Sequence, residues 1–188
     1  IPISENFSFD NYKEIENLLY MLNSDLFENI KLNHKERAES LNKLRKLLVS
    51  EKFDFLIAHN LVLSAKVDQE LGNIKSAIKK SSDSYKLFNT MHKTNELSIN
   101  GSIFAYSNLA NIYSNLNLNN ISLDYLYKAQ KVLKLSKKNY IPKIRIYLNL
   151  GICYHSLGKN KKSLNSFKEI YHLALKEKDY RSLIPIIV

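Results

Sequence analysis

The sequence predicts an all-α fold built from antiparallel helix pairs. Only 4 Gly and 3 Pro among 188 residues leave little material for the many turns of an all-β fold. Long stretches rich in Leu, Lys, Asn and Glu favour helix instead. In addition, one pattern of large and small residues recurs along the chain in a fixed frame, as it does in proteins made of stacked helical repeats.

The first 50 residues are predicted to form one helix pair. Residues 1–8 are expected to be extended, because a proline and several polar residues there disfavour helix. Apolar residues recur at helical spacing in residues 12–22 and again in residues 38–48, with a break at Asn33. The pair has no clean repeat signature, so we interpret residues 1–50 as an N-terminal cap or a divergent first repeat.

Two later stretches carry the recurring pattern most clearly. The upstream copy consists of Tyr106, Leu109, Ala110, Tyr113, Asn117, Ser122, Leu126 and Ala129. The downstream copy consists of Tyr147, Leu150, Gly151, Tyr154, Gly158, Ser163, Phe167 and Ile170. Small side chains let two helices approach closely, and large ones fill the space between them.

This pattern resembles the tetratricopeptide repeat (TPR), a helix–turn–helix unit. The resemblance implies antiparallel helix pairs stacked as a TPR-like right-handed superhelical solenoid. A weaker copy lies upstream, where some frame residues fit and others depart from the family. Leu61, Ala65 and Ala77 fit, whereas Ser64, Asp68 and Ser81 stand where the family has Leu, Tyr and an aromatic residue.

The predicted organisation after residue 50 comprises a weak TPR-like repeat at 51–94, TPR-like repeats at 95–138 and 139–179, and the start of a truncated repeat at 180–188. The two strong copies are 41 residues apart, against about 34 in a standard TPR, so extended helices or longer turns are expected. Gly72 is predicted to end a helix in the left-handed conformation. Asn100 and Gly101 are expected to form a turn, or else to lie at the start of the next helix. An apolar face would be exposed at the last helix, so we expect a fragment of a longer protein.

No catalytic constellation is present in the sequence. The five histidines show no zinc-ligand spacing, and no glycine-rich phosphate-binding motif occurs. Glu36 and Glu39 lie in a polar stretch and are interpreted as solvated. The single cysteine, Cys153, is interpreted as a small buried residue rather than a reactive thiol. We therefore predict that this segment is not an enzyme and binds neither a cofactor nor a metal.

The formal charge of +10 is unevenly spread, since residues 1–40 carry a net −4 and the remaining chain a net +14. Such a basic segment suits an acidic partner, a nucleic acid or a membrane surface. No nucleic-acid recognition motif accompanies the charge, so nucleic-acid binding is not favoured. No apolar run approaches the ~20 residues that span a bilayer. The chain starts at Ile1 rather than Met, so we expect that an upstream segment has been removed.

The TPR resemblance also implies a binding surface, because in that family the first helix of each pair lines a concave groove. The groove residues implied here are Lys66, Asn108, Asn111, Asn115, Arg145, Asn149 and His155. Asn108 and Asn149 take the position where family members often use Asn to hold a peptide backbone, although Asn is also frequent throughout this chain. The basic members favour an acidic peptide or a carboxylate terminus.

Two classes of function follow from the resemblance. The first is a non-catalytic protein- or peptide-binding TPR module, the sensory or regulatory part of a larger bacterial signalling protein such as a diguanylate cyclase or histidine kinase. A variant of it is the peptide-pheromone-binding domain of a cytoplasmic transcriptional regulator. The second class is a structural scaffold without a small ligand. The compartment, periplasmic or cytoplasmic, and homodimerisation stay open at this point.

Overall fold

The computed structural model describes residues 11, 13–19, 32–50, 53–91, 96–136 and 140–178. Its helices are α2 (His34–Ser50), α3 (Asp54–Glu70), α4 (Ile74–Thr90), α5 (Glu96–Asn115), α6 (Asn119–Leu133), α7 (Tyr140–Ser156) and α8 (Asn160–Glu177). Residues 13–19 are helical as well, and no strand occurs in these described ranges, so the all-α class is confirmed for them. The segments 1–8 and 180–188, for which the sequence makes specific predictions, lie outside the described residues.

Contacts within the chain define two compact units, residues 1–87 and 88–188. Their boundary falls inside α4, within the range 51–94 that the sequence predicts as one repeat. The pairs α5/α6 and α7/α8 fall within the predicted ranges 95–138 and 139–179. Each unit is described by itself below.

The core of the first unit forms from residues 13–19 together with α2 and α3. Its buried apolar residues are Ile15, Leu18, Leu41, Leu44, Leu48 and Val67. The three leucines of α2 are three and four positions apart, so they share one helix face and bury it. α3 is joined to α4 by the Ser84 hydroxyl, which donates a hydrogen bond to the Ala58 carbonyl oxygen at 2.7 Å.

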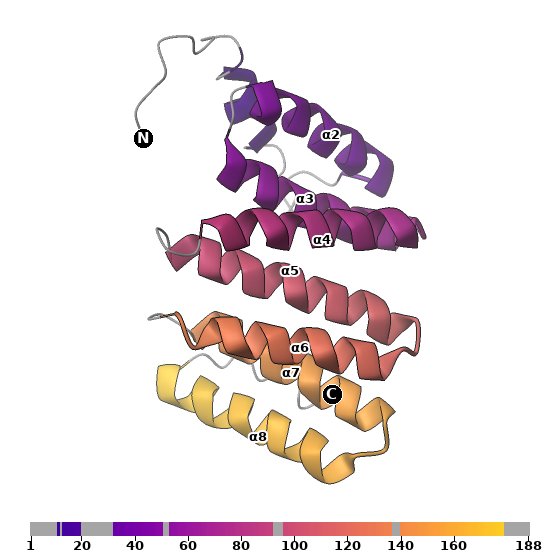
Figure 1. The fold of residues 1–188 in the computed structure, drawn as a ribbon, viewed down its shortest axis with the longest axis vertical. Helices are drawn as coiled ribbons and strands as arrows, with labels where there is room; N and C mark the ends of the chain where they lie inside the picture. The colour runs from indigo at the N-terminus through magenta and orange to yellow at the C-terminus, as the bar shows by residue number, and fades with distance from the viewer. Residues whose placement is uncertain are drawn as a thin grey trace. The chain divides into compact units, whose positions relative to one another are not determined.

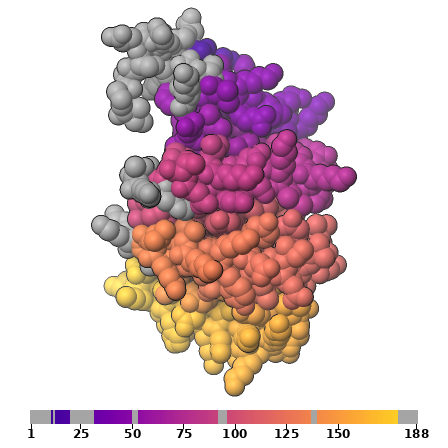
Figure 2. Space-filling model, viewed as in Figure 1, coloured from indigo at the N-terminus to yellow at the C-terminus, as the bar shows by residue number. Residues whose placement is uncertain are grey.

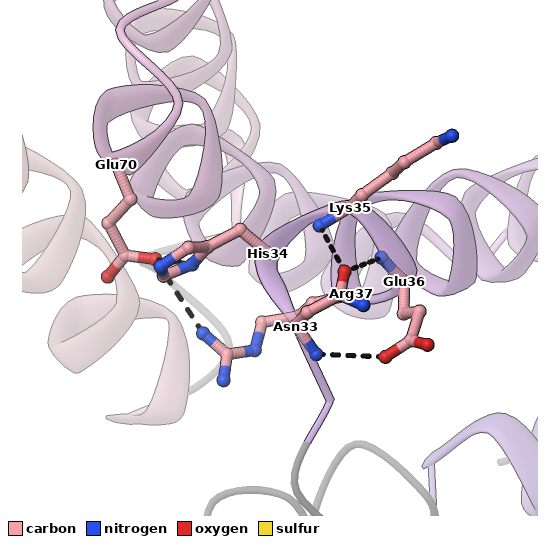
Figure 3. A network of polar contacts seen from close by, with 6 residues as sticks. All are labelled: Asn33, His34, Lys35, Glu36, Arg37 and Glu70. Carbon is pink, nitrogen blue, oxygen red and sulfur yellow. Dashed lines mark hydrogen bonds and ion pairs between the residues drawn. The ribbon is translucent and has the colours of Figure 1, made fainter.

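The helix α2 begins with a reciprocal cap around Asn33 (Figure 3). The Asn33 side-chain oxygen accepts hydrogen bonds from the backbone N–H groups of Lys35 and Glu36, both at 3.0 Å. The Glu36 carboxylate accepts a bond from the Asn33 N–H at 2.9 Å. These bonds satisfy donors that the first turn of a helix leaves without partners. Glu36, which the sequence analysis interprets as solvated, therefore has a structural role as well.

Glu70 ties this end of α2 to the end of α3. Its carboxylate lies 3.0 Å from Nδ1 of His34 and 3.6 Å from a guanidinium nitrogen of Arg37 (Figure 3). The start of one helix thus lies beside the end of the next, as an antiparallel pair requires.

The second unit contains two helix pairs in sequence. α5 packs along α6, and α7 packs along α8 (Figure 1). The pairs contact each other through α6 with α7 and through α5 with α7. In the space-filling view the atoms of the second unit form a continuous surface on the face shown (Figure 2). The first helix of one pair, α5, thus contacts the first helix of the next pair, α7. A solenoid of stacked helix pairs has the same order of contacts.

A three-residue turn closes each of the pairs α3/α4, α5/α6 and α7/α8 in the same way. The N–H groups of Asn73, Leu118 and Lys159 donate to the carbonyl oxygens of Asp68, Tyr113 and Tyr154 at 2.7, 2.9 and 2.8 Å. The middle residue of each turn is left-handed, with φ of 79° at Gly72, 60° at Asn117 and 68° at Gly158. Glycine and asparagine adopt this conformation at the least cost. The left-handed end predicted at Gly72 is confirmed.

Close approach of helices explains two glycines that lie inside helices. A Cβ atom at Gly151 on α7 would lie 2.6 Å from the Phe167 ring of α8. A Cβ atom at Gly101 on α5 would lie 2.5 Å from the Phe88 ring, which is fully buried. Of the two alternatives for Asn100 and Gly101, the turn is wrong and the start of the next helix is confirmed, since both residues lie in the first two turns of α5. Gly101 lies within α5, and it is the neighbouring ring that leaves no space for a side chain there.

We predict that Gly151→Ala destabilises the protein by about 1–2 kcal/mol, because overpacking against Phe167 outweighs the better helix propensity of alanine. Adding Phe167→Leu should recover most of this loss, since Ala110 and Leu126 form the equivalent combination in the α5/α6 pair. Urea unfolding of the single and double variants measures the coupling. Strictly additive effects would contradict the proposed steric match.

We predict that Asn33→Ala lowers the free energy of unfolding by about 1 kcal/mol, because the first turn of α2 loses its side-chain acceptor. Lys35→Ala is the matched control, since Lys35 contributes only its backbone N–H to the cap. Chemical unfolding followed by circular dichroism measures both. Equal stability of the two variants would show that the cap does not stabilise α2.

Candidate functional site

The helices α5 and α7 of the second unit lie against each other, and their contact has a defined register. The Arg145 guanidinium lies over the Phe104 ring, with its central carbon 4.1 Å from the ring centroid. These residues are 41 positions apart, the same offset as between the two strong copies of the pattern. Desolvation lowers the pKa of Arg145, but from so high a value that the side chain stays charged at neutral pH. Positions 104 and 145, which are equivalent in the two strong copies, are therefore neighbours.

The predicted groove residues are solvent-accessible to different degrees. Lys66, Asn111, Asn115, Arg145 and His155 are exposed, and Asn108 and Asn149 are half-buried. Lys66 belongs to α3 of the first unit, and the other six belong to α5 and α7 of the second. Asn108 and Asn149 are again 41 positions apart, so they take equivalent places on the two contacting helices.

The motif residues serve mainly to pack the helix pairs. Tyr106, Leu109, Leu150 and Gly151 are buried, and Tyr113, Tyr147, Tyr154 and Phe167 are half-buried. In the α5/α6 pair the Tyr125 ring stacks on the Tyr113 ring, with centroids 5.5 Å apart and planes 7° from parallel. The Tyr106 ring lies 6.4 Å from Tyr125. Tyr125, which the sequence analysis does not single out, thus completes an aromatic cluster.

A pocket of about 520 Å³ opens between α6, α7 and α8. Three motif residues of α7 form one wall: Tyr147, Leu150 and Tyr154. α6 contributes Gln130, and α8 contributes residues from Lys162 to His172. None of the predicted groove residues lines this pocket.

The α8 wall of the pocket is charged. Its charged lining residues are Lys162, Lys168 and Glu169, so this wall carries two ammonium groups and one carboxylate. The Lys162 ammonium nitrogen lies 5.7 Å from the centroid of the Tyr154 ring, within reach of a cation–π attraction. Burial, followed by the nearby Glu169 carboxylate, raises the pKa of Tyr147. The wall therefore favours anionic groups over cationic ones.

Tyr154 holds its proton tightly. Its hydroxyl lies 2.9 Å from the hydroxyl of Tyr127 on α6. Burial, and then this hydrogen bond, raise the pKa of Tyr154 to about 12. Tyr154 therefore offers a neutral hydroxyl group to the pocket at neutral pH.

Cys153 is buried, as the sequence predicts. Its thiol donates a hydrogen bond to the Asn119 carbonyl oxygen of α6 at 3.2 Å. Burial is the main cause that raises the pKa of Cys153, which disfavours the thiolate. Among the described residues, no three His, Cys, Asp or Glu side chains gather where they could hold a metal ion. Within the same ranges no helix is long and apolar enough to cross a bilayer.

We predict that Tyr154 makes the protein sensitive to alkali. Its pKa is higher in the folded state than the value of about 10 in an unfolded chain, so the folded state retains the proton longer. This stabilisation is complete below about pH 10 and is lost as the pH rises through about 12. Urea unfolding at several alkaline pH values should show a shallower loss of stability for Tyr154→Phe than for the unchanged protein. Tyr171→Phe, which removes an exposed hydroxyl from α8, is the control that should keep the steeper loss.

No protein-family model matches this chain, and no curated protein is significantly similar to it. The TPR resemblance therefore rests on the recurring residues of the sequence itself.

Proposed function

We propose that the chain is a non-catalytic peptide- or protein-binding module of TPR-like helix pairs, with α5 and α7 presenting the binding surface. The observation that carries the proposal is the Phe104–Arg145 contact, which places equivalent positions of α5 and α7 side by side. Asn108 and Asn149, at equivalent places on these helices, can each donate to one peptide carbonyl and accept from one N–H. An extended peptide backbone offers such groups at regular intervals.

The partner that suits this surface is acidic. Arg145 and His155 are exposed on α7, and the chain carries a net charge of +10. Positive side chains around an amide-lined surface attract carboxylates and speed their encounter with the protein. A peptide with acidic side chains or a free carboxylate terminus meets both requirements.

In the proposed context the chain is the sensory or regulatory part of a larger bacterial signalling protein. The alternative context is the peptide-pheromone-binding domain of a cytoplasmic transcriptional regulator, which differs in the flanking domains. A scaffold role is the alternative from another class, and it requires no peptide on α5 and α7. The two classes differ in whether the asparagines of these helices affect binding.

We predict that Asn108→Ala combined with Asn149→Ala weakens binding of a selected peptide about tenfold or more. Each lost side chain removes peptide hydrogen bonds with a net worth of about 0.5–1.5 kcal/mol each. Peptides are first selected from a random 12-residue display library on the unchanged chain, and the dissociation constants are then measured by fluorescence polarisation. We expect the selected sequences to be rich in Asp and Glu.

The matched control is Asn120→Ala combined with Asn160→Ala, two exposed asparagines at the starts of α6 and α8. This pair should leave the affinity unchanged. If the α5/α7 double variant binds as tightly as the control, these helices are not the binding surface and the scaffold function is favoured.

A further inference from the structure

We propose that the pocket between α6, α7 and α8 receives an aromatic side chain from an acidic segment of a partner protein. The ring would stack on Tyr154, in the place that Tyr125 occupies against Tyr113 in the preceding helix pair. This site is separate from the α5/α7 surface, because none of the predicted groove residues lines the pocket.

The two helix pairs of the second unit can be compared residue by residue. α6 starts at Asn119 and α8 at Asn160, and the left-handed turn residues are Asn117 and Gly158. Both offsets are 41 residues, the same as between the motif tyrosines. The same offset matches Tyr125 on α6 to Ser166 on α8.

The three helix pairs α3/α4, α5/α6 and α7/α8 differ in the side chains at one equivalent pair of positions. In the α3/α4 pair, Asp68 stands at the position of the motif tyrosines Tyr113 and Tyr154. The Lys80 ammonium group contacts the Asp68 carboxylate at 2.7 Å. In the α5/α6 pair, the rings of Tyr113 and Tyr125 stack at the corresponding place. In the α7/α8 pair, Tyr154 and Ser166 both line the pocket. The α8 residue over the Tyr154 ring is Lys162, whose ammonium nitrogen lies 5.7 Å from the ring centroid, and no ring stacks there as Tyr125 does on Tyr113.

Ser166 and Tyr154 both line the pocket, and the small Ser166 side chain is only 5% exposed. A ring at position 166 would therefore extend from this wall into the open volume. The Ser166 hydroxyl donates to the Lys162 carbonyl oxygen of its own helix at 3.0 Å, which satisfies it without a ligand. A volume of about 520 Å³ exceeds what one aromatic side chain needs and lies in the usual range for ligand pockets. Stacking of a ring on an aromatic wall contributes about 0.5–1.5 kcal/mol beyond its area.

The charges around the pocket indicate which residues flank the aromatic residue in the partner segment. Lys162 and Lys168 line the pocket against Glu169 alone, and Lys159, Lys161 and Lys176 add positive charge along the same helix and its start. A partner segment with carboxylates on both sides of the aromatic residue would meet these ammonium groups. The pocket is also open to solvent, which suits a side chain held by a polypeptide outside it.

The test uses three acetylated, amidated tripeptides as probes: Glu-Tyr-Glu, Glu-Ala-Glu and Lys-Tyr-Lys. Each is titrated into the isotope-labelled 188-residue chain and followed by NMR. Glu-Tyr-Glu should shift the signals of Tyr147, Tyr154 and Ser166 and bind at least fivefold more tightly than either other peptide. Shifts confined to α5 and the exposed face of α7 would mean binding at the other surface and would overturn the pocket proposal. The same pattern would leave the proposed peptide-binding function intact.

Ser166→Tyr supplies the ring that the α5/α6 pair already has, so it should fill the pocket and weaken Glu-Tyr-Glu binding at least tenfold. Ser156→Tyr is the matched control, because Ser156 is an exposed serine at the end of α7 that does not line the pocket. It should leave binding unchanged. Thermal unfolding checks that both variants fold. If the Ser166→Tyr variant folds and binds Glu-Tyr-Glu as tightly as the unchanged chain, the proposal is wrong.

A second variant keeps the test valid if Ser166→Tyr does not fold. Lys162→Gln combined with Lys168→Gln keeps the side chains' length and removes their charge. This variant should weaken Glu-Tyr-Glu binding several-fold and flatten its salt dependence. An unchanged affinity and salt dependence would show that the α8 wall does not recognise the acidic flanks, which also contradicts the proposal.

Discussion

The close approach of two helices within a pair, set by a small residue facing a large one, is the constraint on which the second unit depends. At the α7/α8 crossing the Phe167 ring occupies the space that a side chain at Gly151 would need. The helices are then near enough for the Ser163 hydroxyl of α8 to donate to the Gly151 carbonyl oxygen at 2.8 Å. This contact fixes the register of α8 on α7, and the register in turn brings Ser166 opposite Tyr154.

A fixed backbone register lets side chains vary at one position without disturbing the pair. At corresponding places the three helix pairs carry different side chains. Asp68 and Lys80 form an ion pair, and the rings of Tyr113 and Tyr125 stack. Tyr154 and Ser166 line a pocket. The shared turn hydrogen bonds explain why such different pairs are tolerated, because they hold the backbone independently of the side chains. In a protein of this design, binding properties can therefore differ from one helix pair to the next.

Much of the fold can be predicted from the sequence, because helical periodicity and left-handed turn residues are local signals. The helix class and the turn at Gly72 are of this kind. For Gly101 the sequence leaves a turn and a helix start open, because the reason for a glycine there is the Phe88 ring, which periodicity cannot reveal. The pocket is missed for a related reason. A serine at position 166 carries no motif, and only comparison with Tyr125 at the same offset shows that a ring is missing. Roles for Asn108 and Asn149 stay a prediction, because a binding role depends on a partner rather than on the packing of the chain.

The buried thiol of Cys153 has a consequence for how motion in this molecule can be observed. It is the single cysteine of the chain, and its thiol donates a hydrogen bond to the carbonyl oxygen of Asn119, the first residue of α6. A thiol reagent can reach the sulfur only after α6 and α7 have separated locally, since the side chain is fully buried between them. The labelling rate of the unmodified protein therefore reports how often this helix interface opens, without the introduction of any probe.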